Sequence, residues 1–304
     1  MTEKHPLVSI IILTMNHEKF IEQACNSAIF QTYPNIEIIL LDNFSCDETY
    51  QKAKDALEKG KVDFQIFSNN ESFGVAKNLN FLVSKCHGDW VAILSGDDWW
   101  AENMIAEKIN FVQKNSFDIV LSDGYKYLQQ SAELVEAYTG KDKDKVVQML
   151  PNFFHENVTE NRTVNVGTFV KKKILEQQPF DEEIQTEDWD MNLRLTHLGY
   201  KIGFLDQKLF YYRVLNSSLS RNWVVMADSY KKVTAKYLDY ILSDKDLAKN
   251  YYLNLLKFHY ESLLSKNENE TEKKKFLKEW KKEKYKLKYS QPLLFFKLLL
   301  LKMI

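Results

Sequence analysis

Short apolar runs alternate with helix-like stretches through the first 121 residues, and this alternation restricts the fold more than any other feature. The apolar runs occupy residues 7–13, 36–41, 64–67, 90–94 and 118–121. Helix-like stretches separate them at residues 18–31, 47–59, 73–85 and 102–114. A repeated strand–helix–strand pattern predicts parallel strands with right-handed crossovers and helices on both faces. We therefore expect a Rossmann-like, three-layer α/β domain with a mostly parallel sheet.

The pattern changes twice further along the chain. Residues 122 to about 165 have mixed charge and no clear period, which indicates an irregular excursion that covers a site. Strand or helix periodicity resumes at residues 166–170, 187–198, 201–205 and 209–212. After residue 222 the chain contains no glycine, and helices are predicted at residues 224–242, 247–265, 272–287 and 292–304. We predict a domain at 1–222, with halves at about 1–121 and 122–222, and a helical C-terminal extension at 223–304.

Composition excludes several classes of protein. The 304 residues are 45% hydrophobic and 27% charged, which is typical of a globular chain. The net charge of -1 gives no basic excess, so nucleic acid is not expected as a partner. Cys25, Cys46 and Cys86 match no metal-ligand spacing and are expected to be reduced thiols of a cytoplasmic protein. Because strand-like residues begin almost at once, secretion is not expected.

Two adjacent carboxylates, Asp97 and Asp98, directly follow the apolar run at residues 90–94. Ligands of parallel sheets gather at the carboxyl ends of strands, and neighbouring carboxylates repel each other unless a cation or hydrogen bonds compensate them. A divalent cation, Mg²⁺ or Mn²⁺, is one interpretation of the pair. The alternative is structural, because Asp98 could cap the helix expected from about residue 101.

Five segments, in this order, resemble the family 2 glycosyltransferases, nucleotide-sugar enzymes of the GT-A fold. The segments are VSIIILTMNHEKFI, IEIILLDNFSCDET, NESFGVAKNLN, LSGDDWW and TEDWDMNLRLTHLGY. Each segment is weak evidence alone, but their common order is specific, and the resemblance extends to about residue 213. It implies a GT-A domain that transfers one sugar with inversion, depends on a metal and uses a UDP-linked or similar donor.

The first three segments hold the residues that the resemblance assigns to the donor. Thr14 and Asn16 can offer hydroxyl, backbone and amide groups to a base or ribose, although a plain polar turn explains them as well. The position of Asp42 accepts the ring N–H of a uracil-type base in the family. Lys77 stands where the family usually has Arg, so a positive charge near the diphosphate remains without the bidentate fork. A solvated helix charge is the competing interpretation of Lys77.

The last two segments imply the metal and the base. The family commonly has another Asp at the position of Ser95, which leaves Asp97 and Asp98 as a two-carboxylate seat completed by the phosphates of the donor. The position of Asp188 is the catalytic base of the family, which takes the proton from the acceptor hydroxyl. Glu187 and Asp188 also open a predicted helix, where an acidic pair is favourable by itself.

The sequence also suggests roles for four further residues. Asp47 is expected to cap the second helix. Arg194 is expected to be a structural ion-pair partner rather than a phosphate ligand. Arg213 or Arg221 could approach the diphosphate.

The C-terminal tail combines basic and apolar residues. Residues 273–288 contain nine Lys and two Glu, and residues 293–304 are nearly all apolar. The apolar stretch is shorter than the roughly twenty residues that span a bilayer. A basic amphipathic helix beside a short apolar one predicts a peripheral anchor on the anionic inner face of the cell membrane. The alternative is packing onto the catalytic domain or onto the partner of a homodimer.

The sequence thus predicts a glycosyltransferase that acts on a glycan or a lipid-linked oligosaccharide for a bacterial surface polysaccharide. The alternative is a catalytically degenerate scaffold that binds a sugar nucleotide in a membrane glycan complex, and the departures at Ser95 and Lys77 keep it open. A nucleotidyltransferase or a Rossmann dehydrogenase would need a glycine-rich loop after the first strand, and residues 14–19 contain no glycine.

Overall fold

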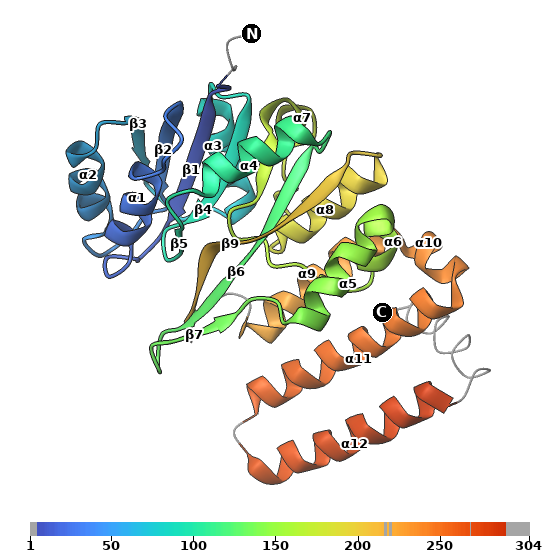
Figure 1. Ribbon diagram of the computed structural model, residues 1–304. Helices are drawn as coiled ribbons and strands as arrows, with labels where there is room; N and C mark the ends of the chain where they lie inside the picture. Colours follow the sequence, from blue (N-terminus) through green and yellow to red (C-terminus); the bar gives the residue numbers. More distant parts are fainter. Residues whose placement is uncertain (1–4, 216–217, 219–220, 268, 290–304) are drawn as a thin grey trace. The chain divides into compact units, whose positions relative to one another are not determined.

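The computed structural model describes residues 5–215, 218, 221–267 and 269–289 (Figure 1). The chain forms two compact units. The first contains residues 1–154 and 162–215, and the second contains residues 155–161 and 216–304. The second unit therefore begins close to the predicted domain end at residue 222, and it also includes a short segment from the middle of the sequence.

A nine-stranded mixed sheet forms the centre of the first unit (Figure 1). The strand order is β3-β2-β1-β4-β8-β6-β9-β5, and β7 pairs with β6. Four strands are mutually parallel: β1 (Val8–Thr14), β2 (Ile36–Asp42), β3 (Asp63–Ser68) and β4 (Trp90–Ser95). Beyond them the direction changes at β8 (Phe169–Lys171), which is antiparallel to both β4 and β6 (Ile119–Leu128). Strand β9 (Ile202–Val214) is parallel to β6 and antiparallel to β5 (Trp99–Trp100).

Helices cover both faces of this sheet. Val8, Ile10 and Ile12 of β1 belong to one apolar cluster, whereas Ile11 belongs to the other, so the strand is buried on both sides. The first cluster includes residues of α1 (Ile21–Ile29), α2 (Thr49–Lys59) and α4 (Met104–Lys114). The second includes residues of α3 (Val75–Lys85), α5 (Gly140–Met149), α7 (Lys172–Gln177) and α8 (Glu187–His197). The expected three-layer, mostly parallel α/β architecture is confirmed.

The expectation of an irregular excursion at residues 122–165 is wrong. Strand β6 continues to Leu128 and forms a hairpin with β7 (Glu133–Glu136). Helix α5, a 3-10 turn (Leu150–Asn152) and the short α6 (Phe153–Asn157) follow. The pairing of β6 with β9 shifts register on both sides of Asp123. Because such bulges interrupt the two-residue alternation of a strand, the sequence pattern gives no clear strand signal there.

Helices α9 to α12 form most of the second unit: α9 (Trp223–Ala235), α10 (Leu238–Ser243), α11 (Lys245–Lys266) and α12 (Glu270–Tyr289). The predicted helix at residues 224–242 is therefore two helices. Tyr230 of α9 packs on Phe258 of α11, with ring centroids 4.8 Å apart, and Tyr260 of α11 stacks on Trp280 of α12 at 6.3 Å. The carbonyl of Thr159 accepts hydrogen bonds from Tyr230 and from Asn254, which ties residues 155–161 to these helices.

The predicted last helix, at residues 292–304, lies outside the described residues. Among the helices that are described, none has both the length and the apolar character that crossing a bilayer requires.

Candidate active site

The carboxyl ends of β1, β2 and β4 lie side by side. Thr14, the last residue of β1, is in register with Asp42 of β2, and Leu13 is in register with Ser95 of β4. Because the strands are parallel, the loops that follow them leave the sheet at the same edge. Three of the segments singled out in the sequence therefore meet at this edge.

Asp98 does not cap a helix. Helix α4 begins at Met104, with Asn103 at its N-cap position. The Asp98 side chain is only 4% exposed, and its Oδ1 accepts the backbone N–H of Arg213 at 2.7 Å. Burial and the neighbouring charge of Asp97 raise the pKa of Asp98 well above its usual range, although Arg213 opposes this. Placing a second negative charge on Asp97 and Asp98 therefore costs free energy.

Arg213 holds the turn that contains Asp97 and Asp98, the acidic turn, in place. Its Nε donates to the backbone oxygen of Asp97 at 2.8 Å, and its two terminal nitrogens donate to Gln129 at 2.5 Å and to Gln23 at 2.6 Å. The guanidinium also lies over three aromatic rings, those of Phe20, Trp99 and Tyr127. With the side chain 5% exposed and its donors used in this way, the main contacts of Arg213 are with the protein rather than with a ligand.

Asp97 is more accessible than Asp98 and connects β4 to the first loop. Its Oδ1 accepts a hydrogen bond of 2.5 Å from the Ser95 hydroxyl, and its Oδ2 lies 4.0 Å from Nε2 of His17. The other ring nitrogen of His17 is 3.3 Å from the hydroxyl of Thr14. Ser95 therefore orients Asp97 by a hydrogen bond.

A cavity of about 130 Å³ brings the acidic turn and the predicted base together. Its polar lining comes from Ser95, Asp98, Asn165, Thr168, Glu187 and Asp188. These residues follow β4, precede β8 and open α8, so only the folded sheet places them around one space. The rest of the wall is formed by Leu79 of α3, Ile93 of β4, Met191 of α8 and the loop residues Val166, Gly167 and Phe180.

Asp188 is half-buried and receives two hydrogen bonds. Its Oδ1 accepts the backbone N–H of Trp189 at 2.6 Å, and its Oδ2 accepts the amide Nδ2 of Asn165 at 2.8 Å. Burial raises the pKa of Asp188, and these two donors partly offset the increase. Burial and the charge of Asp188 raise the pKa of Glu187 as well, to about 8. The pair therefore binds protons more readily than exposed carboxyls do.

The residues predicted to contact the base interlock two loops. Asp42 is 2% exposed, and both of its carboxylate oxygens accept hydrogen bonds from Ser45. Asn16 is exposed and has a positive φ of 56°; its N–H donates to Ser45, and its side-chain oxygen accepts the N–H of Cys46. Thr14 is buried beneath these loops. Contact of these three residues with a base stays a prediction.

Lys77 is exposed in the first turn of α3, and its ammonium lies 3.7 Å from the centroid of the Phe73 ring. A network of asparagine amides, which the sequence interpretation missed, fixes this end of the helix. Asn69 donates to Asn43 and to Asn78, both at 2.9 Å. Three Asn residues, two after strand ends and one in the first turn of a helix, are the signal that could have revealed it.

The expected cap of the second helix is off by one residue, because Glu48 occupies the N-cap position of α2; the carboxylate of Asp47, one residue earlier, still accepts the N–H of Thr49 at 3.0 Å. The expected structural role of Arg194 is confirmed by its contacts. Arg194 lies 3.7 Å from the carboxylate of Asp190 and donates to the carbonyl of Pro179 at 2.7 Å. Both residues stabilise the frame around the site.

A metal ion would find two carboxylates here. Asp97 and Asp98 supply the oxygen ligands that Mg²⁺ and Mn²⁺ prefer, and a cation would relieve the repulsion that raises the pKa of Asp98. Within the described ranges, no three or more His, Cys, Asp or Glu side chains converge. The residues therefore fit a cation that takes its other ligands from a substrate and from water.

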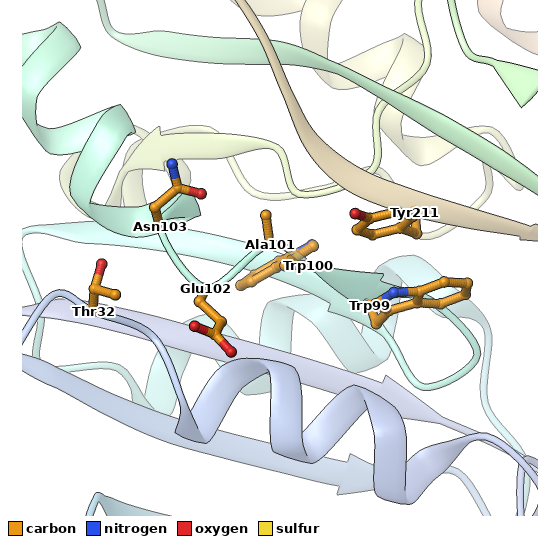
Figure 2. A pocket seen from close by; sticks show the side chains of 7 residues that line it. All are labelled: Thr32, Trp99, Trp100, Ala101, Glu102, Asn103 and Tyr211. Atoms are coloured by element: carbon orange, nitrogen blue, oxygen red, sulfur yellow. The ribbon is translucent and has the colours of Figure 1, made fainter. Parts of the chain in front are cut away.

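A second hollow, of about 520 Å³, lies beside β5 (Figure 2). It is lined by Thr32, Trp99, Trp100, Ala101, Glu102, Asn103 and Tyr211. The rings of Trp99 and Tyr211 stack with centroids 4.9 Å apart, and Trp100 is buried. The two tryptophans after the acidic pair thus pack the edge of the sheet, and none of the predicted site residues lines this hollow.

Comparison with known proteins gives the family of the chain. Residues 9–175 match the sequence profile of Glycosyl transferase family 2. The chain belongs to this family.

Relatives of this family 2 glycosyltransferase cover most of its length. Glycosyltransferase GlyG of Streptococcus pneumoniae serotype 4 is 25% identical in an alignment of 268 residues that covers 84% of this chain and 89% of GlyG. The crystal structure of S. aureus TarS residues 1–349 in complex with UDP has a TM-score of 0.56 at 17% identity, covering 84% of this chain and 86% of that one. The mannosyltransferase PcManGT of Pyrobaculum calidifontis, solved with GDP-Man and Mn²⁺, has a TM-score of 0.62 at 17% identity, covering 78% and 65%. The expected GT-A fold and glycosyltransferase class are confirmed.

Proposed function

We propose that this family 2 glycosyltransferase moves one sugar from a UDP-linked donor to an acceptor hydroxyl, with Asp188 as the base and with inversion at the anomeric carbon. The observation that carries the proposal is the cavity shared by Asp98 and Asp188. A donor sugar in this space would have its leaving diphosphate near the acidic turn and its reacting carbon near the base.

The surroundings of Asp188 suit a general base. Its carboxylate is held by two donors, and burial gives it a raised pKa, which makes it a stronger proton acceptor than an exposed Asp. Asp188 would take the proton as the acceptor oxygen attacks opposite to the departing diphosphate. Such a displacement inverts the anomeric carbon.

Residues at the carboxyl edge would hold the nucleotide. We assign this role to the half at about 1–121, with Thr14, Asn16 and Asp42 toward the base and ribose, and Lys77 toward the diphosphate. The assignment of Lys77 is supported by its exposure and by the absence of an ion pair to it within the described part of the chain. The half at about 122–222 would then bind the acceptor.

Asp97 and Asp98 would hold Mg²⁺ or Mn²⁺ against the diphosphate. When bound, the cation supplies charge neutralisation for the leaving group. This assignment is supported by the two adjacent carboxylates and by the raised pKa of Asp98.

Helix α12 would attach the enzyme to the inner face of the cell membrane. Six of its lysines are exposed between residues 274 and 284, against one exposed glutamate, Glu279. Leu277 and Tyr285 are also exposed, at 38% and 67%, whereas the Trp280 ring packs on α11. A basic surface with exposed apolar side chains suits an anionic bilayer. It also suits a lipid-linked oligosaccharide as the acceptor, for a bacterial surface polysaccharide.

A panel of nucleotide-sugars tests the main proposal. We expect slow hydrolysis of a UDP-sugar in the presence of Mn²⁺ or Mg²⁺, measured as release of UDP, and no hydrolysis by the Asp188→Asn enzyme. A protein that binds UDP-sugars in calorimetry but hydrolyses none of the panel would instead be the degenerate scaffold.

Vesicle co-sedimentation tests the membrane assignment. We expect the triple variant Lys278→Glu, Lys281→Glu, Lys282→Glu to lose binding to vesicles with anionic lipid and to leave hydrolysis unchanged. A variant with the same change of charge at Lys19, Lys59 and Lys61 is the matched control. If the α12 variant bound anionic vesicles as well as the control variant does, protein packing or dimerisation through α12 would be favoured.

A further inference from the structure

Asn165 connects the candidate base to the wall of the cavity. Its amide Nδ2 donates to Oδ2 of Asp188 at 2.8 Å, and its Oδ1 accepts the amide Nδ2 of Asn192 at 2.7 Å. Asn192 lies on α8, one turn after Asp188, and is buried. The three side chains therefore form a line in which each amide donates toward the carboxylate.

The chemistry of the three groups determines which atom donates and which accepts in these hydrogen bonds. If the Asn165 amide were reversed, its oxygen would face the ionised Asp188, and its NH₂ group would face that of Asn192. Both contacts would be repulsive. An ionised Asp188 therefore selects the observed orientation of Asn165, and Asn192 supports it.

The segment that carries Asn165 is itself held firmly. Lys108 of α4 is completely buried, and its ammonium donates to the backbone oxygens of Gly167 and Val120. The next residue, Thr168, accepts the N–H of Ile93 from β4 at 3.1 Å. Since these contacts lie within three residues of Asn165, the amide meets Asp188 from a fixed position.

We propose that Asn165 is a positioning residue of the transfer reaction, which holds the Asp188 carboxylate toward the cavity and stabilises its ionised form. This inference rests on the proposed role of Asp188 as the base. It goes beyond that role because it places the control of the base on a second segment, the one that precedes β8. Asn192 has the supporting role, since it contacts Asn165 and not Asp188.

Other ionisable groups near Asp188 act in the opposite direction or act weakly. Glu187 precedes it on α8, Asp98 faces the same cavity from the end of β4, and Tyr138 lies close enough for the charge of Asp188 to contribute to its raised pKa. The two carboxylates disfavour ionisation of Asp188, and Tyr138 is neutral at ordinary pH. The groups that favour the ionised form are the backbone N–H groups of Trp189 and of Asp188 itself and, as the side chain among them, Asn165.

The pH dependence of kcat in Asn165 variants tests the proposal. In Asn165→Ala, loss of one donated hydrogen bond should raise the pKa of the base, so the acidic limb of the profile moves up by about one pH unit. At neutral pH we expect kcat to fall roughly tenfold, as is usual for residues that orient a functional group, with little change in KM for the nucleotide-sugar. Asn165→Asp should move the limb further, because a negative charge replaces the donor.

Three controls separate a positioning role of Asn165 from a purely structural role and from a wrong assignment of the base. Asn192→Ala should move the limb in the same direction by a smaller amount, and Asn254→Ala, which removes an amide donor in the second unit, should not move it. A lower melting temperature with an unmoved limb in Asn165→Ala would overturn the proposal and leave Asn165 a structural residue. If Asp188→Asn itself retained transfer, the assignment of the base would be wrong, and the role of Asn165 would fail with it.

Discussion

Two pairs of adjacent acidic residues lie at one cavity but have different surroundings: of the first pair only Asp98 lines the cavity, whereas both Glu187 and Asp188 of the second do. Asp97 and Asp98 follow β4 and are held by Arg213, a buried cation with aromatic rings around it. Glu187 and Asp188 open α8, and the donors to Asp188 are an amide and a backbone N–H, both neutral. Burial and the charge of Asp97 raise the pKa of Asp98, and a nearby cation would lower it again. Burial also raises the pKa of Asp188, but there neutral hydrogen-bond donors provide the opposing effect.

The largest expected effect comes from removing the base. Asp188→Asn keeps the shape of the side chain and its contact with Asn165 but cannot accept a proton. We expect kcat to fall about a thousandfold, with nucleotide binding nearly intact, because general-base catalysis contributes up to roughly 10⁴-fold. Steady-state kinetics and UDP calorimetry measure the two quantities. Turnover at a tenth of the wild-type rate or more would remove the functional contrast between the two pairs.

The next effect concerns the first pair. Asp98→Asn should lower kcat about a hundredfold and abolish stimulation by Mn²⁺, because one of the two carboxylates is lost. For the wild-type protein we expect calorimetry to find weak Mn²⁺ binding without nucleotide and tighter binding with UDP. Tight binding of Mn²⁺ to the protein alone would mean that further ligands come from the protein, contrary to a two-carboxylate seat.

The third effect concerns Arg213, which holds Asp97 and Asp98 by hydrogen bonds. Arg213→Lys keeps a charge but loses the guanidinium contacts with Gln23, Gln129 and the Asp97 carbonyl. We expect unfolding in urea to show a loss of about 2–4 kcal/mol, as for buried polar groups left without partners. Arg194→Lys, at a more exposed site, is the matched control and should cost less. Equal losses in the two variants would mean that Arg213 has no special role at the pair.

The last effect is the pH dependence of stability at the second pair. The pKa of Glu187 is raised from 4.5 to about 8 in the folded state, so the folded state holds a proton that the unfolded state releases. Stability from this group is fully present below about pH 4.5 and is lost as the pH rises toward 8. Glu187→Gln should therefore give a flatter dependence of the free energy of unfolding on pH between these values. An unchanged slope would show that Glu187 is solvated, like an ordinary surface carboxylate.

The two halves of the sheet differ in how well the sequence predicts them. Strands β1 to β4 are short apolar runs between regular helices, and their local pattern identifies them. Strands β6 and β9 pair over ten residues with register shifts around Asp123, and the hairpin with β7 has an exposed second strand. Because bulges and exposed faces remove the apolar alternation, the same method fails between residues 122 and 165.

The residues of the candidate site also differ in how well the sequence predicts them. The order of five segments was sufficient to indicate the family, and the strand ends were sufficient to place Thr14, Asp42 and Asp97 along one edge. Asn165 lies in a stretch without a recognisable motif, so no local signal connects it with Asp188. The sequence offers Arg213 or Arg221 as a residue that could approach the diphosphate, because it does not show that Arg213 is buried.

The sequence by itself determined the alternation of strands and helices, the family and the identity of the acidic residues, since these depend on local periodicity and on motifs in order. Only the tertiary structure decided that Asp98 binds Arg213 instead of capping a helix, and that Asp98, Asn165 and Asp188 share one cavity. The physical reason is that the state of a carboxylate depends on burial and on nearby donors and charges. Those neighbours come from segments up to 115 positions away in the chain, and folding alone brings them together.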